Sequence, residues 1–503
     1  MANWAMLLDR AERVHPDLTA IAAEGDTWTF ADVARTARVA SAGLGDLGIG
    51  VGDRVMVVAR TVPEYLLLAG AVARAGAVLV SVNFRLSADE VAMVAMDSAS
   101  IAVAADADSM DLVDQVVERV PNLRVRISLE STTRPGWHAF QSLANGEAVG
   151  PLRHMQGSDL ARIMYTSGTT GRAKGVEVTH QMWVFNTMAQ VRVLDVRRGD
   201  RILLAAPLHH VGGLDLPGLG AWMAGATLVL QRRFSAEESV ELMRDQQITG
   251  GTLVHTMLHR LVRAESAALA DLRLRWLQFG TLPVSLVNAL RRLMPDVALI
   301  RGYGMTETLG GLCHNVITAE SSDLTSVGFP LPFMEVRIVE AAGRECPRGT
   351  DGAIQVRGPK VTPGYFGDPE GTAEALRDGW LDTGDIGCLD KEGRLTITDR
   401  SKDLIRSGGE SISSREVEEV LYRHPAVHDA AVVARPDEHW GEIPVAFVVT
   451  TDEVSDAELV EHCRSSLAGF KVPKQFLRVD DLPRNSSGKV AKPDLRARLV
   501  DHP

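Results

Sequence analysis

Strands and helices are expected to alternate along this chain, and no other feature of the sequence restricts the fold as strongly. From Gly52 an apolar run (54–60) precedes a helical pattern (63–76), a second run (77–83), a second helical pattern (87–98) and a third run (100–106). The same order returns after Asp200, with a helical segment of small residues around Gly218–Gly225. This alternation is typical of parallel sheets covered by helices. The sequence therefore predicts an α/β fold.

Two further parts follow. Short alternating runs with glycine turns near Glu335–Glu340, Gly352–Arg357 and Arg394–Thr398 predict a smaller β-rich part. After Asp399 the pattern becomes that of a compact mixed α/β unit of about a hundred residues. A chain of 503 residues exceeds one ordinary domain. We place the main boundary at 399–402 and divide the chain into residues 1–399 and 400–503.

Composition excludes several classes of protein. The formal net charge is −12 and no run of like charge stands out, which argues against a nucleic-acid surface. The apolar stretch 65–84 carries Arg74 at its middle, so we expect a buried helix and strand, not a membrane span. The N-terminus shows no signal-peptide pattern. The cysteines lie far apart, without metal-ligand or disulfide spacing, and favour a reducing cytoplasm; they are Cys313, Cys346, Cys388 and Cys463. No sequence pattern indicates the oligomeric state.

Gly43, Gly45 and Gly48 match the dinucleotide-binding pattern GxGxxG only formally. That fingerprint requires a strand before the glycines and a helix after them. Here a helical pattern precedes them and an apolar run follows, so we interpret the segment as a helix end and turn. An oxidoreductase of the Rossmann type would depend on this weak match.

The segment 165–175, YTSGTTGRAKG, is rich in groups that bind anions. Its hydroxyl side chains, its glycines and Lys174 would present O–H, backbone N–H and ammonium donors to phosphate. It does not fit the GxxxxGK[ST] phosphate loop. Because apolar runs flank it on both sides, we expect a hairpin whose loop covers a polyphosphate. An ordinary surface turn is the structural alternative.

Three further clusters carry chemistry. Residues 302–307, GYGMTE, follow an apolar strand, at the strand end where α/β proteins bind ligands. There Tyr303 could stack on a base, and Glu307 offers an oxygen ligand for Mg²⁺. Residues 380–385, WLDTGD, and 399–403, DRSKD, supply an aspartate suited to a ribose diol and an arginine suited to phosphate. Lys489 lies in a polar loop near the end of the chain and could equally be a solvated lysine.

Together, in this order, these segments resemble the adenylate-forming superfamily of acyl- and aryl-CoA synthetases, peptide-synthetase adenylation domains and luciferases. The resemblance covers essentially the whole chain and includes PLHHVGG (207–213) and DRSKDLIRSGGE (399–410). It implies a large N-terminal domain of layered α/β subdomains with a β-rich subdomain, and a small mobile C-terminal domain. It also implies an ATP-dependent acyl-CoA synthetase that uses Mg²⁺ and CoA. Such an enzyme first makes an acyl-adenylate from a carboxylic acid and then transfers the acyl group to a thiol.

The resemblance assigns residues to roles. The expected ATP and AMP contacts are Thr166, Ser167, Gly168, Thr169, Thr170, Gly171, Lys174, Gly280, Thr281, Leu282, Tyr303, Gly304, Thr306, Asp385 and Arg400. The expected catalytic residues are Lys489, His210, Thr306 and Glu307, with Glu307 also the metal ligand. Lys402 takes the hinge position. The expected CoA-binding residues are Arg406, Ser407, Gly408, Gly409 and Glu410. His210 could alternatively be a gate or a packed core imidazole.

The turn at 278–283, QFGTLP, departs from the family pattern. Phe279, Thr281 and Leu282 stand where small residues usually line the nucleotide, so we expect either a narrower adenine slot or a reshaped acyl pocket. Arg301, Ala173, His209 and His255 also differ from the usual residues. These differences leave open an enzyme specialised for thioester formation from preformed acyl-adenylate, or a nucleotide-binding module without catalysis. The segment SGGE favours free CoA over a carrier protein as the acceptor. The sequence does not name the acid.

Overall fold

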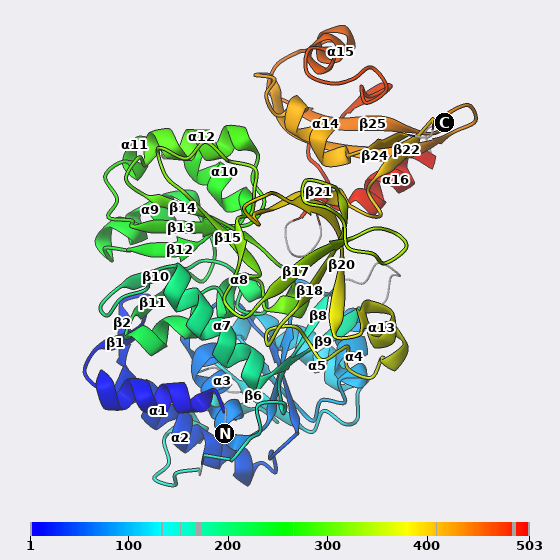
Figure 1. Cartoon of the computed structure of the whole chain (residues 1–503). Helices are drawn as coiled ribbons and strands as arrows, with labels where there is room; N and C mark the ends of the chain where they lie inside the picture. Colours follow the sequence, from blue (N-terminus) through cyan, green and yellow to red (C-terminus); the bar gives the residue numbers. More distant parts are fainter. Residues whose placement is uncertain are drawn as a thin grey trace.

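The computed structural model describes residues 3–131, 134–150, 152–166, 173–264, 266–408, 410–484 and 489–500. Two large sheets, a smaller β-rich layer and a C-terminal unit at one end of the molecule make up the fold (Figure 1). The predicted α/β class, with a large N-terminal part and a smaller C-terminal one, is confirmed.

The first large sheet contains the alternation that begins at Gly52. Its strands pair in parallel except at the edge formed by the last two, β8 and β9. In spatial order they are β7 (His138–Ala139), β6 (Val125–Ser128), β5 (Ala102–Ala105), β3 (Arg54–Val58), β4 (Val78–Val82), β8 (Leu160–Thr166) and β9 (Lys174–Thr179). The connecting helices are α3 (Pro63–Ala75), α4 (Ala88–Asp97), η1 (Ala107–Ser109), α5 (Met110–Val117) and α6 (Phe140–Ala144). The predicted hairpin around segment 165–175 is the antiparallel pair β8–β9.

The second large sheet has a parallel centre and antiparallel edges. Its order is β16 (Phe329–Pro330), β15 (Cys313–Ile317), β14 (Ala298–Tyr303), β13 (Trp276–Phe279), β12 (Gly250–Thr252), β10 (Arg201–Leu204), β11 (Thr227–Leu230), β1 (Thr19–Ala23) and β2 (Asp26–Thr29). The helices of this part are α1 (Ala5–Val14), α2 (Phe30–Asp46), α7 (His180–Val193), α8 (Val211–Leu214), η2 (Gly218–Ala224), α9 (Ala236–Asp245), α10 (His255–Ala264), α11 (Ser266–Leu269), α12 (Val284–Leu293) and η3 (Thr306–Thr308). Gly43 and Gly45 lie inside α2 and Gly48 follows it with φ 77°, so this segment is a helix end and turn, as predicted.

The β-rich layer and the C-terminal unit each hold one sheet. The first contains β17 (Glu335–Val339), β18 (Gly352–Arg357), β20 (Trp380–Leu389), β19 (Leu376–Arg377) and β21 (Leu395–Arg400), with α13 (Pro369–Ala375) beside it. The second contains β23 (Glu410–Ile412), β22 (Ile405–Ser407), β25 (Gly441–Thr450), β24 (Val427–Asp437) and β26 (Gln475–Arg478), with α14 (Ser414–Leu421), α15 (Asp456–Arg464) and α16 (Lys492–Val500). The chain passes from one sheet to the other between Arg400 and Ile405.

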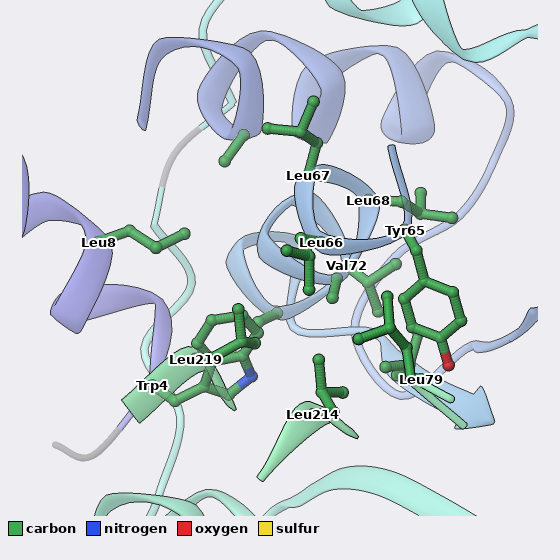
Figure 2. Packing of buried hydrophobic residues seen from close by; sticks show 14 of the residues in the cluster. Trp4, Leu8, Tyr65, Leu66, Leu67, Leu68, Val72, Leu79, Leu214 and Leu219 are labelled. Atoms are coloured by element: carbon green, nitrogen blue, oxygen red, sulfur yellow. The ribbon is translucent and has the colours of Figure 1, made fainter. Parts of the chain in front are cut away.

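Helix α3 is the apolar run that contains Arg74, and it lies in the middle of the main core. Pro63 stands in its first turn, where a missing N–H costs nothing, and Gly76 ends it with φ 73°. Every residue from Tyr65 to Ala75 is buried. Arg74 satisfies its charge inside the protein, because its Nη1 lies 2.9 Å from Asp9 Oδ1. Figure 2 shows the side chains packed around α3, including Trp4, Leu8, Tyr65, Leu66, Leu68, Leu79, Leu214 and Leu219.

None of the helices in the described ranges combines the length and the apolarity that crossing a membrane requires. The interpretation of residues 65–84 as a buried helix followed by a strand is therefore confirmed by α3 and β4.

A buried ion pair joins the two large sheets. The guanidinium of Arg162 on β8 donates to Asp215 Oδ2 at 2.7 Å and to Ser81 Oγ of β4 at 2.8 Å. It also donates to the carbonyl oxygens of Leu208 and His209, both at 3.2 Å. The Arg162 and Asp215 side chains are both 0% exposed. One side chain therefore fixes the segment 208–215 of the second sheet against the first.

Among the described residues, hydrogen bonds and a ring contact join the C-terminal unit to the rest. The backbone N–H of Ser414 donates to Asp399 Oδ2 at 2.6 Å, and the N–H of Val284 donates to Glu419 Oε1 at 3.0 Å. The rings of His259 and His428 meet at 4.5 Å between centroids. These contacts place α14 and β24 beside α10, α12 and the end of β21.

We expect Asp215→Asn to lower the free energy of unfolding by about 3–5 kcal/mol, because the substitution leaves the Arg162 charge buried without its counter-ion. The double variant Arg162→Met, Asp215→Leu should lose less, since neither charge remains. Urea unfolding followed by tryptophan fluorescence measures both. Glu340→Gln, in an exposed pair with Arg344, is the control and should change stability by under about 0.5 kcal/mol. A loss for Asp215→Asn no larger than that of the control would contradict this account.

A buried histidine makes stability depend on pH. His180 opens α7, is 0% exposed, and burial lowers its pKa to about 4. Because the unfolded chain binds the proton more tightly than the native state, stability is complete above about pH 6.5 and falls as the pH decreases towards 4. Between pH 7.5 and 5.5 the loss from this group is about 1.4 kcal/mol. We expect His180→Gln to remove that part of the pH dependence, whereas His138→Gln, at an exposed position, should retain the wild-type slope.

Candidate active site

The predicted site residues converge at one edge of the second sheet. His210 follows β10, the turn 280–283 follows β13, and Thr306 and Glu307 follow β14. Because these strands are parallel, their carboxyl ends meet at the same edge, which is where open α/β sheets bind ligands. The β-rich layer adds Asp385 and Arg400, and the C-terminal unit adds Lys489.

Asp385 is held by two side chains that the sequence assigned to the nucleotide. Tyr303 donates its hydroxyl to Asp385 Oδ2 at 2.7 Å, and Arg400 Nε donates to Oδ1 at 3.1 Å. Burial, followed by the neighbouring carboxylate, raises the pKa of Tyr303 well above its usual value, so the phenol remains a donor. A carboxylate has about four acceptor positions. Asp385 therefore keeps capacity for a diol, while Tyr303 is fixed in orientation.

Glu307 is a buried carboxylate whose partner the sequence analysis missed. Its side chain is 7% exposed, and its Oε1 accepts the hydroxyl of Tyr365 at 3.0 Å. Burial raises the pKa of Glu307, while the Tyr365 hydrogen bond and the positive charges of Arg400 and Lys489 act in the opposite direction. Tyr365 lies in GYFGDPE, a segment without strand or helix periodicity, so no pattern pointed to it.

Lys174 begins β9 and faces the same tyrosine. Its Nζ lies 4.8 Å from the centre of the Tyr365 ring and 3.9 Å from Asp368 Oδ2. Thr166 ends β8 opposite Lys174. The predicted loop residues Ser167, Gly168, Thr169, Thr170 and Gly171 lie outside the described residues.

His210 caps the short helix α8. Its Nδ1 accepts the backbone N–H of Gly212 at 3.1 Å, which places the ring proton on Nε2. Burial, followed by the charge of Lys489, lowers the pKa of His210 to about 4. The imidazole is therefore neutral at physiological pH and has one N–H to donate into the site. His210 is half-buried, and its role near the acid, as a gate or as a packed imidazole, stays a prediction.

Lys489 lies within electrostatic range of Glu307, Asp385, Arg400 and His210. Its side chain is accessible to solvent, but both parts of the chain crowd around it. Desolvation by this crowding and the charge of Arg400 lower the pKa of Lys489, whereas Asp385 and Glu307 raise it. The structure therefore brings the terminal lysine to the carboxylates named in the sequence analysis.

The structure places the large side chains of the unusual turn at 278–283 in the core. Phe279 and Leu282 are 1% and 2% exposed, and both side chains pack into the core beneath the sheet. Gly280 and Thr281 are exposed, and Gly280 has open space where a side chain would stand. Arg301 is also buried and donates Nη2 to the Leu282 carbonyl at 3.0 Å. The buried side chains of Phe279 and Leu282 thus anchor the turn in the core, and Gly280 and Thr281 form its exposed part.

The turn expected to bind CoA contacts its own unit in this structure. The N–H of Arg406 donates to Glu442 Oε2 at 2.7 Å, and the N–H of Gly408 donates to the Trp440 carbonyl at 2.8 Å. A side chain at Gly408 would lie 2.8 Å from the Trp440 ring, and φ is 59°, so glycine is required. Ser407 is buried in β22, Glu410 is exposed in β23, and Gly409 lies outside the described residues.

The hinge candidate Lys402 stands between the two sheets. Its carbonyl oxygen accepts Arg496 Nη2 at 3.3 Å, and its side chain is exposed. Partial burial and the nearby Arg400 lower the pKa of Lys402. Two residues further on, Leu404 still bonds back to the carbonyl of Arg400, so the sheets are joined by a single tight turn.

Known proteins are similar to this chain in both sequence and fold. The AMP-binding enzyme family matches residues 8–366, and the C-terminal domain of AMP-binding enzymes matches residues 416–489. A feruloyl-CoA synthase from an Amycolatopsis species is 35% identical over 99% of each chain. A 2-succinylbenzoate–CoA ligase from Bacillus cereus is 34% identical over 100% of this chain and 99% of its own.

Solved structures agree. The o-succinylbenzoate CoA synthetase of Bacillus subtilis with its acyl-adenylate has a TM-score of 0.87 at 31% identity, covering 100% of this chain and 99% of that one. ATP-bound MatB from Rhodopseudomonas palustris has a TM-score of 0.89 at 30% identity, covering 99% of each. Both family segments match and the relatives align along the whole length. The chain therefore belongs to the AMP-binding enzymes, the adenylate-forming superfamily, in their acyl-CoA synthetase branch.

Proposed function

We propose that this enzyme activates a carboxylic acid with ATP as an acyl-adenylate and then transfers the acyl group to the thiol of CoA. The observation that carries the proposal is the convergence of Lys489 with Glu307, Asp385 and Arg400, groups from three separate parts of the chain. Formation of an acyl-CoA is also the activity that the names of the full-length relatives describe.

The residues present fit the magnesium ion that such chemistry uses. In the described part of the chain, no group of three or more His, Cys, Asp and Glu side chains could hold a metal by itself. Mg²⁺ needs only one or two protein carboxylates when substrate phosphates and water complete its six ligands. Glu307 meets that requirement. When bound, the ion would neutralise phosphate charge in the first step.

In the first step a carboxylate oxygen attacks the α-phosphorus of ATP, and pyrophosphate leaves. Two anions must approach one another, so catalysis is mainly electrostatic and positional. Lys489 neutralises the acid and the ribose side of the transition state, and the neutral His210 donates its Nε2–H towards the acid carboxylate. Lys174 and the loop after Thr166 hold the β- and γ-phosphates, and Thr306 contacts the α-phosphate.

The adenosine is held by a separate set of residues. Tyr303 packs on the adenine beside Gly280, Thr281 and Gly304, while Leu282 contributes only backbone. Asp385 binds the ribose diol, supported by Arg400. In the second step the CoA thiol attacks the acyl carbon and AMP leaves. We propose that the unit after Lys402 turns for this step, which withdraws Lys489 and brings Arg406–Glu410 to the pantetheine.

Two alternative activities are compatible with the same fold. One is an enzyme that accepts preformed acyl-adenylate and only makes thioesters, and the other loads a carrier protein in place of free CoA. The buried positions of Phe279 and Leu282 remove the main reason for expecting impaired adenylation. We propose a cytoplasmic location, in keeping with the reduced cysteines, all four of which are free.

We expect Lys489→Ala to abolish pyrophosphate release while largely sparing thioester formation from supplied acyl-adenylate. The reason is that Lys489 stabilises charge only in the first transition state. Both half-reactions are measured separately. Lys391→Ala, an exposed lysine in the turn between β20 and β21, is the matched control and should leave both unchanged. Equal loss of the two half-reactions in Lys489→Ala would refute the assignment.

We expect a panel of acids to reveal the substrate through two separate readouts, pyrophosphate release and CoA-thioester formation. Because the full-length relatives are named for feruloyl and succinylbenzoyl groups, aryl-bearing acids head the panel, followed by aliphatic and polycyclic acids. Both products should appear with the same acid. Thioester only from supplied acyl-adenylate would establish the first alternative, and transfer only to a phosphopantetheinyl carrier the second.

A further inference from the structure

Tyr365 lies where the phosphate hairpin meets the loop that carries Glu307. Its segment runs alongside β9: the N–H of Phe366 donates to the Gly175 carbonyl at 2.7 Å, and the N–H of Glu177 donates to the Gly364 carbonyl at 3.1 Å. Three residues earlier, the N–H of Thr362 donates to the Glu307 carbonyl at 2.8 Å. The segment 362–366 is therefore hydrogen-bonded to both partners, which are far apart in sequence.

The Tyr365 side chain makes the same connection. Its hydroxyl donates to Glu307 Oε1 at 3.0 Å, and its ring lies 4.8 Å below the ammonium of Lys174. The hydroxyl of Tyr365 therefore orients the Glu307 carboxylate, and its ring orients the Lys174 ammonium.

Packing alone does not account for the hydroxyl. The ring is only half-buried, and a phenylalanine would occupy the same volume beside Lys174. The hydroxyl donates to Glu307, a carboxylate that is only 7% exposed and whose charge is costly to bury without a donor. Lys174 has a second neighbour close to Tyr365 in sequence, because its Nζ lies 3.9 Å from Asp368 Oδ2.

We propose that Tyr365 is a positioning residue for adenylate formation. It aims the Glu307 carboxylate at the magnesium ion and holds Lys174 for the β- and γ-phosphates, so that the metal and phosphate halves of the triphosphate site are set together. This inference rests on the proposed function for its substrate, ATP, but not on the identity of the acid.

Tyr365→Phe tests the hydroxyl and keeps the ring. We expect the Mg²⁺ concentration for half-maximal pyrophosphate release to rise about tenfold, because a hydrogen bond to a charged group is lost. At saturating Mg²⁺ the KM for ATP should stay near the wild-type value. Tyr365→Leu also removes the ring face from Lys174, so its KM for ATP should rise even at saturating Mg²⁺.

A binding measurement separates this inference from the proposed function. The affinity for α,β-methylene-ATP is titrated calorimetrically with and without Mg²⁺, in the absence of any acid. In Tyr365→Phe the Mg²⁺-dependent gain in affinity should shrink about tenfold, with metal-free affinity unchanged. In Tyr365→Leu the metal-free affinity should fall as well. This readout remains valid even if no acid in the panel is turned over.

Tyr422→Phe is the matched control, because Tyr422 also donates its hydroxyl to a carboxylate, Asp429 Oδ1 at 2.6 Å, but in the C-terminal unit. It should leave the Mg²⁺ dependence unchanged. Thermal unfolding midpoints of all variants are compared. Wild-type Mg²⁺ dependence in Tyr365→Phe would overturn the proposal. So would an activity loss that is equal at every Mg²⁺ concentration and follows a lowered unfolding midpoint, because that pattern indicates a merely structural residue.

Discussion

The ion pair between Arg162 and Asp215 is the constraint on which the site depends. A charge pair at 0% exposure needs support from further hydrogen bonds, and here the Arg162 guanidinium also donates to Ser81 and to two carbonyl groups. Those carbonyls belong to Leu208 and His209, the residues just before His210. The hydrogen bonds that offset the desolvation cost of the buried guanidinium therefore also fix the loop that carries His210. A looser, hydrated pair would leave His210 without a defined position relative to the first sheet.

Much of the architecture could be predicted because it depends on local patterns of apolar and polar residues in the sequence. Alternating apolar and helical periods predicted the parallel strands β3, β4 and β5 and the intervening helices, and the hairpin β8–β9 followed from apolar runs around a glycine-rich loop. Rejection of the GxGxxG match relied on the same logic, since strand and helix stood in the wrong order. The family motifs then located Asp385, Glu307 and Lys489, which the structure places within electrostatic range of one another.

Other features depend on how distant segments meet, and no local pattern carries them. The orientation of Phe279 and Leu282 is an example: strand β13 is buried on both faces, Leu282 lies beyond its end, and only the packed core decides where these two side chains go. Tyr365 is another, because its role comes from contacts with residues 58 and 191 positions away, Glu307 and Lys174. The contacts of the turn 406–410 with the β24–β25 hairpin were equally invisible, since they describe one arrangement of the C-terminal unit.

The described contacts that seat this unit include those of Ser414 with Asp399 and of Glu419 with the N–H of Val284. Ser414 donates to Asp399 from both its N–H and its hydroxyl, whereas Glu419 accepts a single N–H. A hydrogen bond to a charged group contributes about 1.5–3 kcal/mol. In the proposed turn of this unit these contacts would be the ones that part. None of their residues is among the predicted site residues, so substitutions there would change the rate of the movement and leave the reacting groups as they are.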